Sequence, residues 1–324
     1  MEEPVAGVQE PLEAARTAEV ARRIVANLRR VMHAPDETLE LCVLCLLSEG
    51  HLIIEDLPGV GKTTLAKALA RSVDLSFSRM QFTPDLLPSD VTGVNVYDQR
   101  SNEFEFRPGP VFANILLVDE INRTSPKTQA ALLEAMQERQ VTIDGVTYLL
   151  APPFMVMATQ NPIEYEGTYP LPEAQLDRFT MRIAIGYPPL AAEAQMLTEQ
   201  TTQAPLESLE PVADAQEVLG AIEAARRVYV EESLRRYVVA LVRHTRGDGR
   251  LHLGASPRAG INLLRVAKAR ALVAGRDYVV PDDVKAAAPP VLAHRLILAP
   301  EARSSGLSDS DIVREAVDRT PVPV

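Results

Sequence analysis

The feature that most constrains the fold of this chain is a glycine-rich turn between an apolar segment and a helical pattern. The segment Leu52-Ile53-Ile54 is followed by EDLPGVGKTT at positions 55–64, and the helical pattern starts at Leu65. An apolar strand, a glycine-rich turn, Lys-Thr and a helix, in that order, are typical of a loop that binds nucleotide phosphates. The strict pattern has Gly at position 56, where this chain has Asp, but Pro58-Gly59 still supplies a tight turn.

Such a loop binds phosphates through its backbone and through two side chains. The N–H groups at the helix N-terminus point toward the β-phosphate. Lys62 places a positive charge between the β- and γ-phosphates, and the Thr63 hydroxyl is a candidate ligand of Mg²⁺. The sequence therefore predicts that a nucleoside triphosphate binds at Gly59, Val60, Gly61, Lys62, Thr63 and Thr64.

Composition narrows the class of protein. With 324 residues, of which 46% are hydrophobic and 24% charged, the chain is typical of a globular protein with two domains and a large core. The formal net charge of -11 makes nucleic acid an unfavourable partner, because binding to phosphate backbones needs clustered Lys and Arg. The N-terminus lacks a signal-peptide pattern, and no apolar run is long enough to span a membrane. We therefore expect a cytoplasmic protein that does not insert into membranes.

The two cysteines, Cys42 and Cys45, lie three residues apart in an apolar run. This spacing puts both thiols on one face of a helix, but no second Cys pair or nearby His completes a metal site. We predict two reduced thiols in the core.

The distribution of apolar segments predicts an α/β fold. Strands are expected at 51–55, 76–82, 114–119 and 154–159, of which the last two are apolar runs, and helices at 11–30, 38–47, 63–72 and from Ser125-Pro126 onward. Nearly continuous apolar strands between helices indicate a parallel sheet that is covered on both faces.

Two segments interrupt this alternation, and the chain then changes character. Residues 91–112 contain short alternating stretches, and residues 140–150 are typical of a hairpin around Asp144-Gly145, so both are predicted to be β insertions. Beyond Gly186 the pattern is mostly helical. We predict an α/β core over 1–190, a linker over 191–205 and a small all-α lid over 206–324, with a polar tail after Pro300 that frays.

Two acids and an amide follow predicted strands. Asp119 and Glu120 end the apolar run from Ile115; we assign Asp119 to Mg²⁺ and Glu120 to orienting and polarising the attacking water. Asn161 ends the next apolar strand and reaches the γ-phosphate and that water if its strand lies beside the Asp119 strand. The alternative for Asn161 is an ordinary Asn-Pro turn.

Two arginines are candidates for stabilising the transferred phosphoryl group. Arg178 lies in LPEAQLDRF, a segment similar to those that present an arginine finger to the nucleotide of a neighbouring subunit. The alternatives are a surface Asp-Arg pair, and Arg123 in the same role. Arg258 follows Ser256-Pro257, and this pair is typical of a helix start. The helix dipole disfavours a cation in the first turn. An Arg at this position therefore indicates an anionic partner, such as the γ-phosphate. An ordinary exposed Arg remains the alternative.

Together these segments resemble the MoxR family of the AAA+ ATPases. The matching stretches cover about residues 50–265 and include EDLPGVGKTTLAKALA, QFTPDLLPSDVTG, FRPGPVFANILLVDEINR, KTQAALLEAMQERQVTIDG, ATQNP, YPLPEAQLDRF and SPRAGINLL. In the terms of that family, residues 59–64 resemble Walker A, Asp119 and Glu120 Walker B, Asn161 sensor one, Arg178 the arginine finger and Arg258 sensor two. The two β insertions resemble the helix-two insert and the hairpin before sensor one.

The resemblance implies a ring of identical subunits, commonly a hexamer, that hydrolyses ATP with Mg²⁺ at subunit interfaces. It also implies a chaperone-like role in remodelling or maturing a protein client, often with a partner that carries a von Willebrand factor A domain. Residues 31–35 depart from the family, which often has a Gly-Gln motif near the adenine at this place.

Three other functions remain open from the sequence. A DNA-acting motor is disfavoured because residues 98–107 contain two Arg against one Asp and two Glu. A metal-chelatase motor subunit resembles the same clade, and the physical chemistry of the residues does not separate it from MoxR. A scaffold that binds ATP without turnover is disfavoured by Glu120, Asn161 and Arg178.

Overall fold

The centre of the molecule is a five-stranded parallel sheet. We analysed a computed structural model, in which residues 11–161, 169, 171–188, 190, 192–193 and 205–322 are described. The strands lie in the order β2-β5-β8-β1-β9, and every pairing between them is parallel, which confirms the predicted α/β fold. Their bounds are β1 (Leu52–Glu55), β2 (Phe77–Gln81), β5 (Ile115–Asp119), β8 (Met155–Gln160) and β9 (Met181–Ile183).

Apolar side chains cover both faces of this sheet, as predicted. In β1, Leu52 and Ile54 belong to one buried cluster, whereas Ile53 belongs to the other. In β5 the same alternation separates Leu117 from Leu116. Successive side chains of a strand point to opposite faces, so a strand that is buried on both sides needs an unbroken apolar run.

Helices of the core lie on both sides of the sheet. Their bounds, with those of two 3₁₀ turns, are α1 (Pro11–Arg29), α2 (Asp36–Leu47), α3 (Lys62–Ser72), α4 (Pro88–Thr92), α5 (Pro126–Glu138), α6 (Glu173–Leu176), η1 (Pro110–Phe112) and η2 (Ile121–Arg123). Residues of α2 and α3 are buried in the same cluster as Leu52, and Leu132 of α5 is buried in the cluster that contains Ile53. The helices therefore exclude water from both sheet faces.

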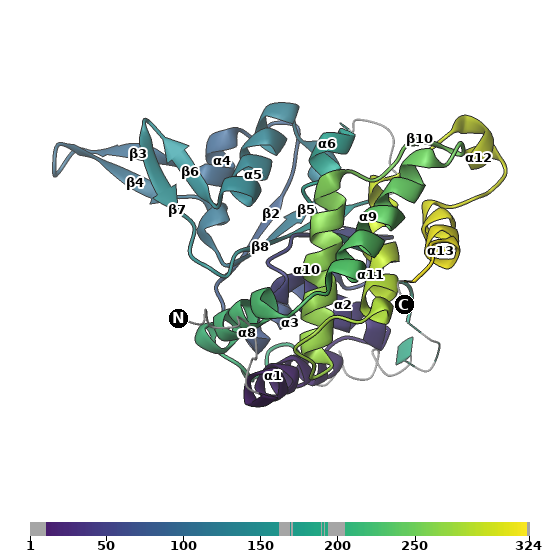
Figure 1. Cartoon of the computed structure of the whole chain (residues 1–324). Helices are drawn as coiled ribbons and strands as arrows, with labels where there is room; N and C mark the ends of the chain where they lie inside the picture. The colour runs from purple at the N-terminus through teal and green to yellow at the C-terminus, as the bar shows by residue number, and fades with distance from the viewer. Residues whose placement is uncertain are drawn as a thin grey trace, which may run out of the picture.

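The two predicted β insertions are antiparallel hairpins that pack on each other and project from the body of the molecule (Figure 1). They consist of β3 (Gly93–Asp98) with β4 (Glu103–Pro108), and β6 (Gln140–Ile143) with β7 (Val146–Leu149). Asp144 and Gly145 have φ angles of 48° and 82°, which suits a tight hairpin turn. The rings of Phe106 and Tyr148 stack with centroids 4.2 Å apart and join the hairpins.

The C-terminal part is helical, as predicted, with one small sheet. It comprises α8 (Ala215–Arg227), α9 (Glu232–Gly247), α10 (Pro257–Val273), α11 (Pro281–Leu292), η3 (Ala293–Arg295), α12 (Pro300–Ser304) and α13 (Asp309–Arg319), and the strands β10 (Leu251–Leu253) and β11 (Ile297–Leu298). α1 lies beside α8 and α10, so the N-terminal helices join the core to the lid (Figure 1). The predicted linker, 191–205, lies outside the described residues except for 192–193 and 205.

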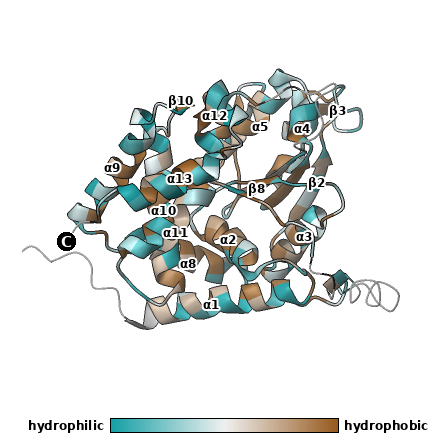
Figure 2. Cartoon of the chain, turned by 90° about the vertical axis from the view of Figure 1, so that its right-hand side faces the viewer, coloured by the Kyte–Doolittle hydropathy of each residue, from teal (hydrophilic) through white to brown (hydrophobic). Residues whose placement is uncertain are grey.

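The prediction that the tail after Pro300 frays was wrong. Residues 309–319 form α13, in which Ile312, Val313 and Ala316 are buried. These three residues recur at helical spacing, so one apolar stripe packs on the lid although the segment is polar overall. Figure 2 shows the same mixture of hydrophilic and hydrophobic residues on α1 and α9.

Both cysteines are buried, as predicted. Cys42 and Cys45 are free thiols in the core, and burial raises the pKa of Cys42 to about 12. Over the described ranges, no cluster of three or more His, Cys, Asp and Glu is placed to hold a metal ion. Among those same residues, no helix combines the length and the apolarity that crossing a membrane requires.

Candidate nucleotide-binding site

The glycine-rich turn that the sequence predicts to bind phosphates joins β1 to α3. Gly59 and Gly61 have φ angles of 85° and 93°, in the left-handed region that glycine adopts most readily. Gly61 caps α3, which begins at Lys62. A Cβ on Gly61 would lie 3.3 Å from the terminal methyl of Met32, so the segment after α1 is packed against the loop. The N–H groups of the first turn of α3 are therefore free of intrahelical partners and are able to bind an anion.

A pocket of about 370 Å³ opens at the carboxyl ends of the strands, where ligands bind in open α/β sheets. Of the predicted nucleotide-binding residues, Val60 alone does not line it; its side chain packs on the core instead. The lining residues are Pro58, Gly59, Gly61, Lys62, Thr63, Thr64, Arg79, Gln81, Asp119, Glu120, Thr159 and Asn161.

Asp119 ends β5 and is held by its two neighbouring strands. Arg79 of β2 donates from Nε to Asp119 Oδ2 at 2.6 Å, and the Thr159 hydroxyl of β8 donates to Asp119 Oδ1 at 3.3 Å. The carboxylate is thus oriented from both sides at the edge of the pocket. The charge of Arg79 balances that of the Asp119 carboxylate.

Glu120 follows directly and has an unusual backbone. Its φ of 56° lies in the left-handed region, which costs a residue other than glycine about 1–3 kcal/mol and persists where the surrounding structure imposes it. The Glu120 N–H donates to Thr159 Oγ1 at 2.9 Å. Its carboxylate accepts from Gln81 Nε2 and pairs with Arg123 Nε at 3.2 Å. Glu120 and Gln81 both line the pocket.

Asn161 and Lys62 complete the pocket. β8 lies between β5 and β1, so Asn161, which follows β8, meets the condition that its strand lies beside the Asp119 strand. Lys62 Nζ donates to the backbone oxygen of Asp56. Burial lowers the pKa of Lys62, and the carboxylates of Asp56, Asp119 and Glu120 oppose that shift.

Asp56 stands where the strict motif has glycine, and its side chain links the loop to another segment of the chain. One oxygen of its buried carboxylate accepts from the N–H groups of Ile185 and Gly186 at 2.6 and 2.7 Å, and the other accepts from the Leu57 N–H at 2.8 Å. The phosphate loop is therefore tied to the chain that leaves β9.

The oxygen donors in this pocket fit a magnesium ion. Thr63 offers a hydroxyl and Asp119 a carboxylate, and both line the same pocket as Lys62. Mg²⁺ prefers oxygen ligands and is commonly held by one or two protein groups together with substrate phosphates. The donor set is of that kind.

Arg178 and Arg258 lie away from this pocket and close to each other. Both line a second pocket of about 250 Å³, together with Arg139 of the core and Arg265 of the lid. Burial and then the charge of Arg258 lower the pKa of Arg178. This structure thus brings the two arginines together, and it does not bring either one to the phosphate loop of its own chain.

A buried ion pair lies next to both arginines in the chain. Arg295, whose side chain is 2% exposed, donates from Nε to Asp177 at 2.8 Å, and the Ser256 hydroxyl donates to the same carboxylate at 2.9 Å. Asp177 precedes Arg178, and Ser256 caps α10 ahead of Arg258 by accepting from the Ala259 N–H. The Asp177 carboxylate therefore joins the end of α6 to the start of α10.

Sequence reasoning missed Arg79, Gln81, Thr159 and Asp177. A signal existed for two of them, because Arg79 and Gln81 lie two residues apart in a predicted strand and hence on one face. No sequence pattern around Thr159 or Asp177 indicates their contacts, because their hydrogen-bond partners lie far away in the chain.

Comparisons with known proteins match both the core and the lid of this chain. Residues 51–181 match the family described as ATPase family associated with various cellular activities, and residues 243–316 match the AAA lid domain. Chaperone MoxR1 of Mycobacterium tuberculosis is 42% identical over 93% of this chain and 82% of its own length. Protein MoxR of Methylorubrum extorquens is 31% identical over 94% and 96%, respectively. A crystal structure from Cytophaga hutchinsonii superposes with a TM-score of 0.89 at 39% identity and covers 97% of both chains.

Proposed function

Because the chain belongs to the MoxR family of AAA+ ATPases, we propose that it hydrolyses ATP with Mg²⁺ at the interfaces of a ring and thereby remodels or matures protein complexes. The observation that carries this proposal is the separation of two sets of residues. Lys62, Asp119 and Glu120 line one pocket, whereas Arg178 and Arg258 line another. Each chain thus supplies one part of a hydrolytic site to its own nucleotide and the other part to the nucleotide of a neighbour.

The first part binds ATP and activates water. The loop N–H groups and Lys62 bind the phosphates, and Asp119 with the Thr63 hydroxyl holds Mg²⁺, which offsets charge on the phosphate oxygens. Glu120 orients a water molecule and accepts its proton as the water oxygen bonds to the γ-phosphorus. The bond from that phosphorus to the bridging oxygen breaks, and ADP leaves with the electron pair. Asn161 donates from its amide to the γ-phosphate.

The second part stabilises the charge that develops during transfer. Arg178 and Arg258 are two cations held side by side, and the charge of Arg258 contributes to lowering the pKa of Arg178. An anion between them offsets this repulsion. The γ-phosphate of a neighbour's ATP, placed there, receives two planar donor groups at once. The ring that this requires is, by resemblance, a hexamer.

The two hairpins offer a surface for a protein client. Phe104 and Leu149 are 71% and 76% exposed, and Val94, Tyr97 and Val146 are also exposed on the same insertions. Apolar side chains that stand on a projecting hairpin pair are typical of an interaction surface rather than of a monomer surface (Figure 1). We assign them to client contact. Beyond the client, we expect a partner with a von Willebrand factor A domain.

Replacing Glu120 with Gln tests the proposal. The substitution keeps the shape and the hydrogen bond from Gln81 but removes the proton acceptor, so we expect phosphate release to fall about 10²- to 10⁴-fold. ATP binding, measured by equilibrium titration, stays unchanged. The exposed Glu301 provides the matched control, because Glu301→Gln is the same chemical change remote from the pocket. Normal turnover by Glu120→Gln would refute the assignment.

The same variant identifies the client. Glu120→Gln binds ATP without hydrolysing it, so a client held in the ATP state is not released. Proteins recovered with Glu120→Gln in the presence of ATP, and absent with Lys62→Ala, are the expected clients. Recovery of a metal-chelatase subunit or of salt-sensitive DNA instead would contradict the remodelling role.

A further inference from the structure

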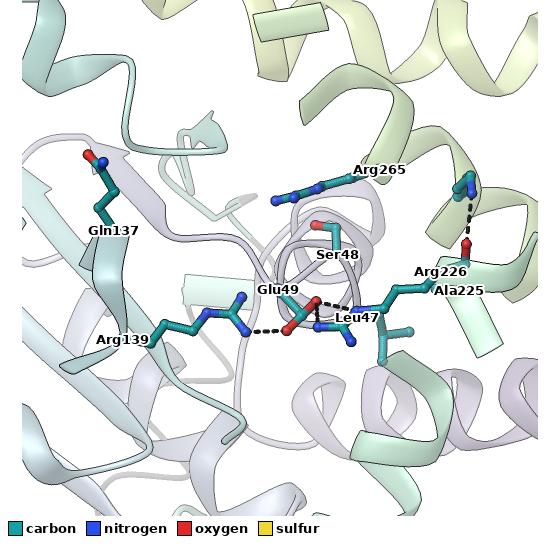
Figure 3. A pocket seen from close by; sticks show the side chains of 9 residues that line it. Leu47, Ser48, Glu49, Gln137, Arg139, Ala225, Arg226 and Arg265 are labelled. Atoms are coloured by element: carbon teal, nitrogen blue, oxygen red, sulfur yellow. Dashed lines mark hydrogen bonds and ion pairs between the residues drawn. The ribbon is translucent and has the colours of Figure 1, made fainter. Parts of the chain in front are cut away.

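A basic cavity lies between the core and the lid, apart from the phosphate loop. It has a volume of about 470 Å³. It is lined by Leu47, Ser48, Glu49, Gln137, Arg139, Ala225, Arg226, Arg265 and Lys268. We refer to it as the core–lid pocket; Figure 3 shows the Glu49 carboxylate between the guanidinium groups of Arg139 and Arg226, with Arg265 reaching over the same space.

The charge of this lining is unbalanced. Four cationic side chains face one carboxylate, Glu49, and that carboxylate is already paired with both Arg139 and Arg226. Burial raises the pKa of Glu49, but the hydrogen bonds and charges of Arg139 and Arg226 together outweigh it, so the pKa is lowered. Arg226 also pairs with Glu223, outside the lining. Two cations therefore exceed the carboxylates even when Glu223 is included.

Arg265 and Lys268 carry that excess. They lie three residues apart on α10 and so share one face of the helix. Over the described residues, neither side chain pairs with a carboxylate; Lys268 Nζ donates instead to the backbone oxygen of Arg226 at 2.7 Å. Burial lowers the pKa of Lys268, and the charge of Arg235 lowers it further. In a protein with a net charge of -11, this local excess of positive charge is unexpected unless an anion binds there.

We propose that the core–lid pocket binds a phosphorylated small molecule of nucleotide size at a site separate from the phosphate loop. The volume lies within the range of about 300–1,000 Å³ that is typical of small-molecule sites. Guanidinium groups donate two parallel hydrogen bonds to phosphate oxygens, and Lys adds a point charge, so this donor set suits phosphate better than a single carboxylate.

Such a ligand joins the core to the lid. Arg139 and Glu49 come from the core, whereas Arg226, Arg265 and Lys268 come from α8 and α10 of the lid. The pocket also adjoins the one that contains Arg178 and Arg258, since Glu49, Gln137, Arg139 and Arg265 line both. A bound anion therefore acts on the position of the helix that carries Arg258.

Thermal unfolding of a variant without a working phosphate loop tests the proposal. In the Lys62→Ala background, we expect saturating tripolyphosphate to raise Tm by about 5 °C. Adding Arg265→Gln and Lys268→Gln should abolish this shift, because these substitutions remove the two cations that lack a carboxylate partner. The charge-matched control adds Arg178→Gln and Arg258→Gln instead and should keep the shift. Titration calorimetry of the same proteins measures the affinity directly.

Three results would overturn the proposal. The first is no change in Tm with tripolyphosphate. The second is equal loss of the shift in both double variants, which would place the anion in the Arg178 pocket of the proposed interface. The third is an equal shift with a glutamate-rich peptide, which would identify a carboxylate partner. Circular dichroism and the Tm without ligand establish whether each variant folds. If the variant with both Arg265→Gln and Lys268→Gln does not fold, the variant with Lys268→Gln alone is tested in its place. None of these measurements depends on ATP hydrolysis, so their outcome is independent of the proposed function.

Discussion

At the scale of single residues, Asp56 shows how a departure from a motif acquires a structural role. The strict phosphate-loop pattern has glycine at this position, yet the Asp56 carboxylate accepts three backbone N–H groups, from Leu57, Ile185 and Gly186. A carboxylate that accepts several backbone hydrogen bonds is well satisfied even when buried. The sequence allowed this substitution, since Pro58-Gly59 retains the turn, but did not indicate these contacts.

The lowered pKa of His51 leads to a prediction of how the stability of the fold depends on pH. It is buried; Nε2 donates to the Met136 oxygen while Nδ1 accepts from the Val156 N–H, and burial lowers its pKa from 6.5 to about 4. In the unfolded chain, His51 therefore takes up a proton as the pH falls through 6.5. In the folded protein it remains neutral until the pH approaches about 4. The contribution of His51 is complete above pH 6.5 and is lost as the pH falls toward 4. We expect His51 alone to lower the free energy of unfolding by about 2 kcal/mol between pH 7.5 and 5.

Urea unfolding at the two pH values measures this drop. Burial lowers the pKa of His294 as well, so the wild-type protein shows a change of the same sign from two histidines. The variant His51→Gln should be less stable at pH 7.5 and should lose less stability at pH 5. Exposed His252→Gln serves as the control. Equal pH dependence in wild type and His51→Gln would contradict the assignment.

At the scale of elements, the ends of helices place the functional groups. α3 begins at Lys62 directly after the left-handed Gly61, and α10 begins after the Ser256 cap and presents Arg258 in its first turn. The Ser256 hydroxyl makes two hydrogen bonds at the start of α10: it accepts from the Ala259 N–H and donates to the Asp177 carboxylate. The start of α10 is therefore held by a residue of the core.

Asp177 is predicted to be a positioning residue for Arg178 and Arg258. We expect Asp177→Asn to weaken the contacts to Arg295 and Ser256 and to lower kcat about 10-fold or more, because small misplacement of a stabilising group is costly. The affinity for ATP, which depends on the phosphate loop, should not change. Asp248→Asn breaks another Asp-Arg pair of the lid, with Arg250, and should leave kcat unchanged. A shift in KM at constant kcat would show that Asp177 acts elsewhere.

At the scale of the whole molecule, the proposed function requires two copies of the chain to complete one hydrolytic site. The phosphate-loop pocket and the Arg178 pocket share no lining residue. The Arg178 pocket adjoins the core–lid pocket, because both are lined by Glu49, Arg139 and Arg265. Core and lid together therefore form one basic region in a protein whose net charge is negative. In the proposed mechanism, assembly of the subunits brings the residues of these two pockets together.

Mixing two inactive variants tests this requirement. Lys62→Ala subunits lack a working phosphate loop, and Arg178→Gln subunits lack the finger, so each alone should be nearly inactive. In an equimolar mixture about a quarter of the interfaces combine an intact loop with an intact finger, and ATPase activity should return in that proportion. Lys62→Ala mixed with Glu120→Gln is the control, because both changes affect the same half of the site. Absence of recovery in the first mixture would refute the proposal that Arg178 acts in the neighbouring site.

Much of the fold was predictable because its signals are local. The apolar runs of β1 and β5, the Asp144-Gly145 turn and the Ser125 and Ser256 caps each lie within a few residues of the structure that they specify. The tail was mispredicted because its overall polarity concealed the stripe of Ile312, Val313 and Ala316. The roles of Lys62, Asp119 and Glu120 remain predictions, but their convergence on one pocket follows from parallel strands ending at one edge.

The sequence by itself determined the parallel α/β core, the helical lid and the phosphate loop, because periodicity and turn residues act between neighbours in the chain. Only the tertiary structure decided that Arg79 faces Asp119, that Asp177 joins Arg295 to Ser256, and that Arg178 and Arg258 share a pocket. It also assembled the core–lid pocket from Glu49, Arg139, Arg226, Arg265 and Lys268. The physical reason is that hydrogen bonds and charges act through space over a few ångströms, whereas these partners are separated by tens to hundreds of residues in the sequence.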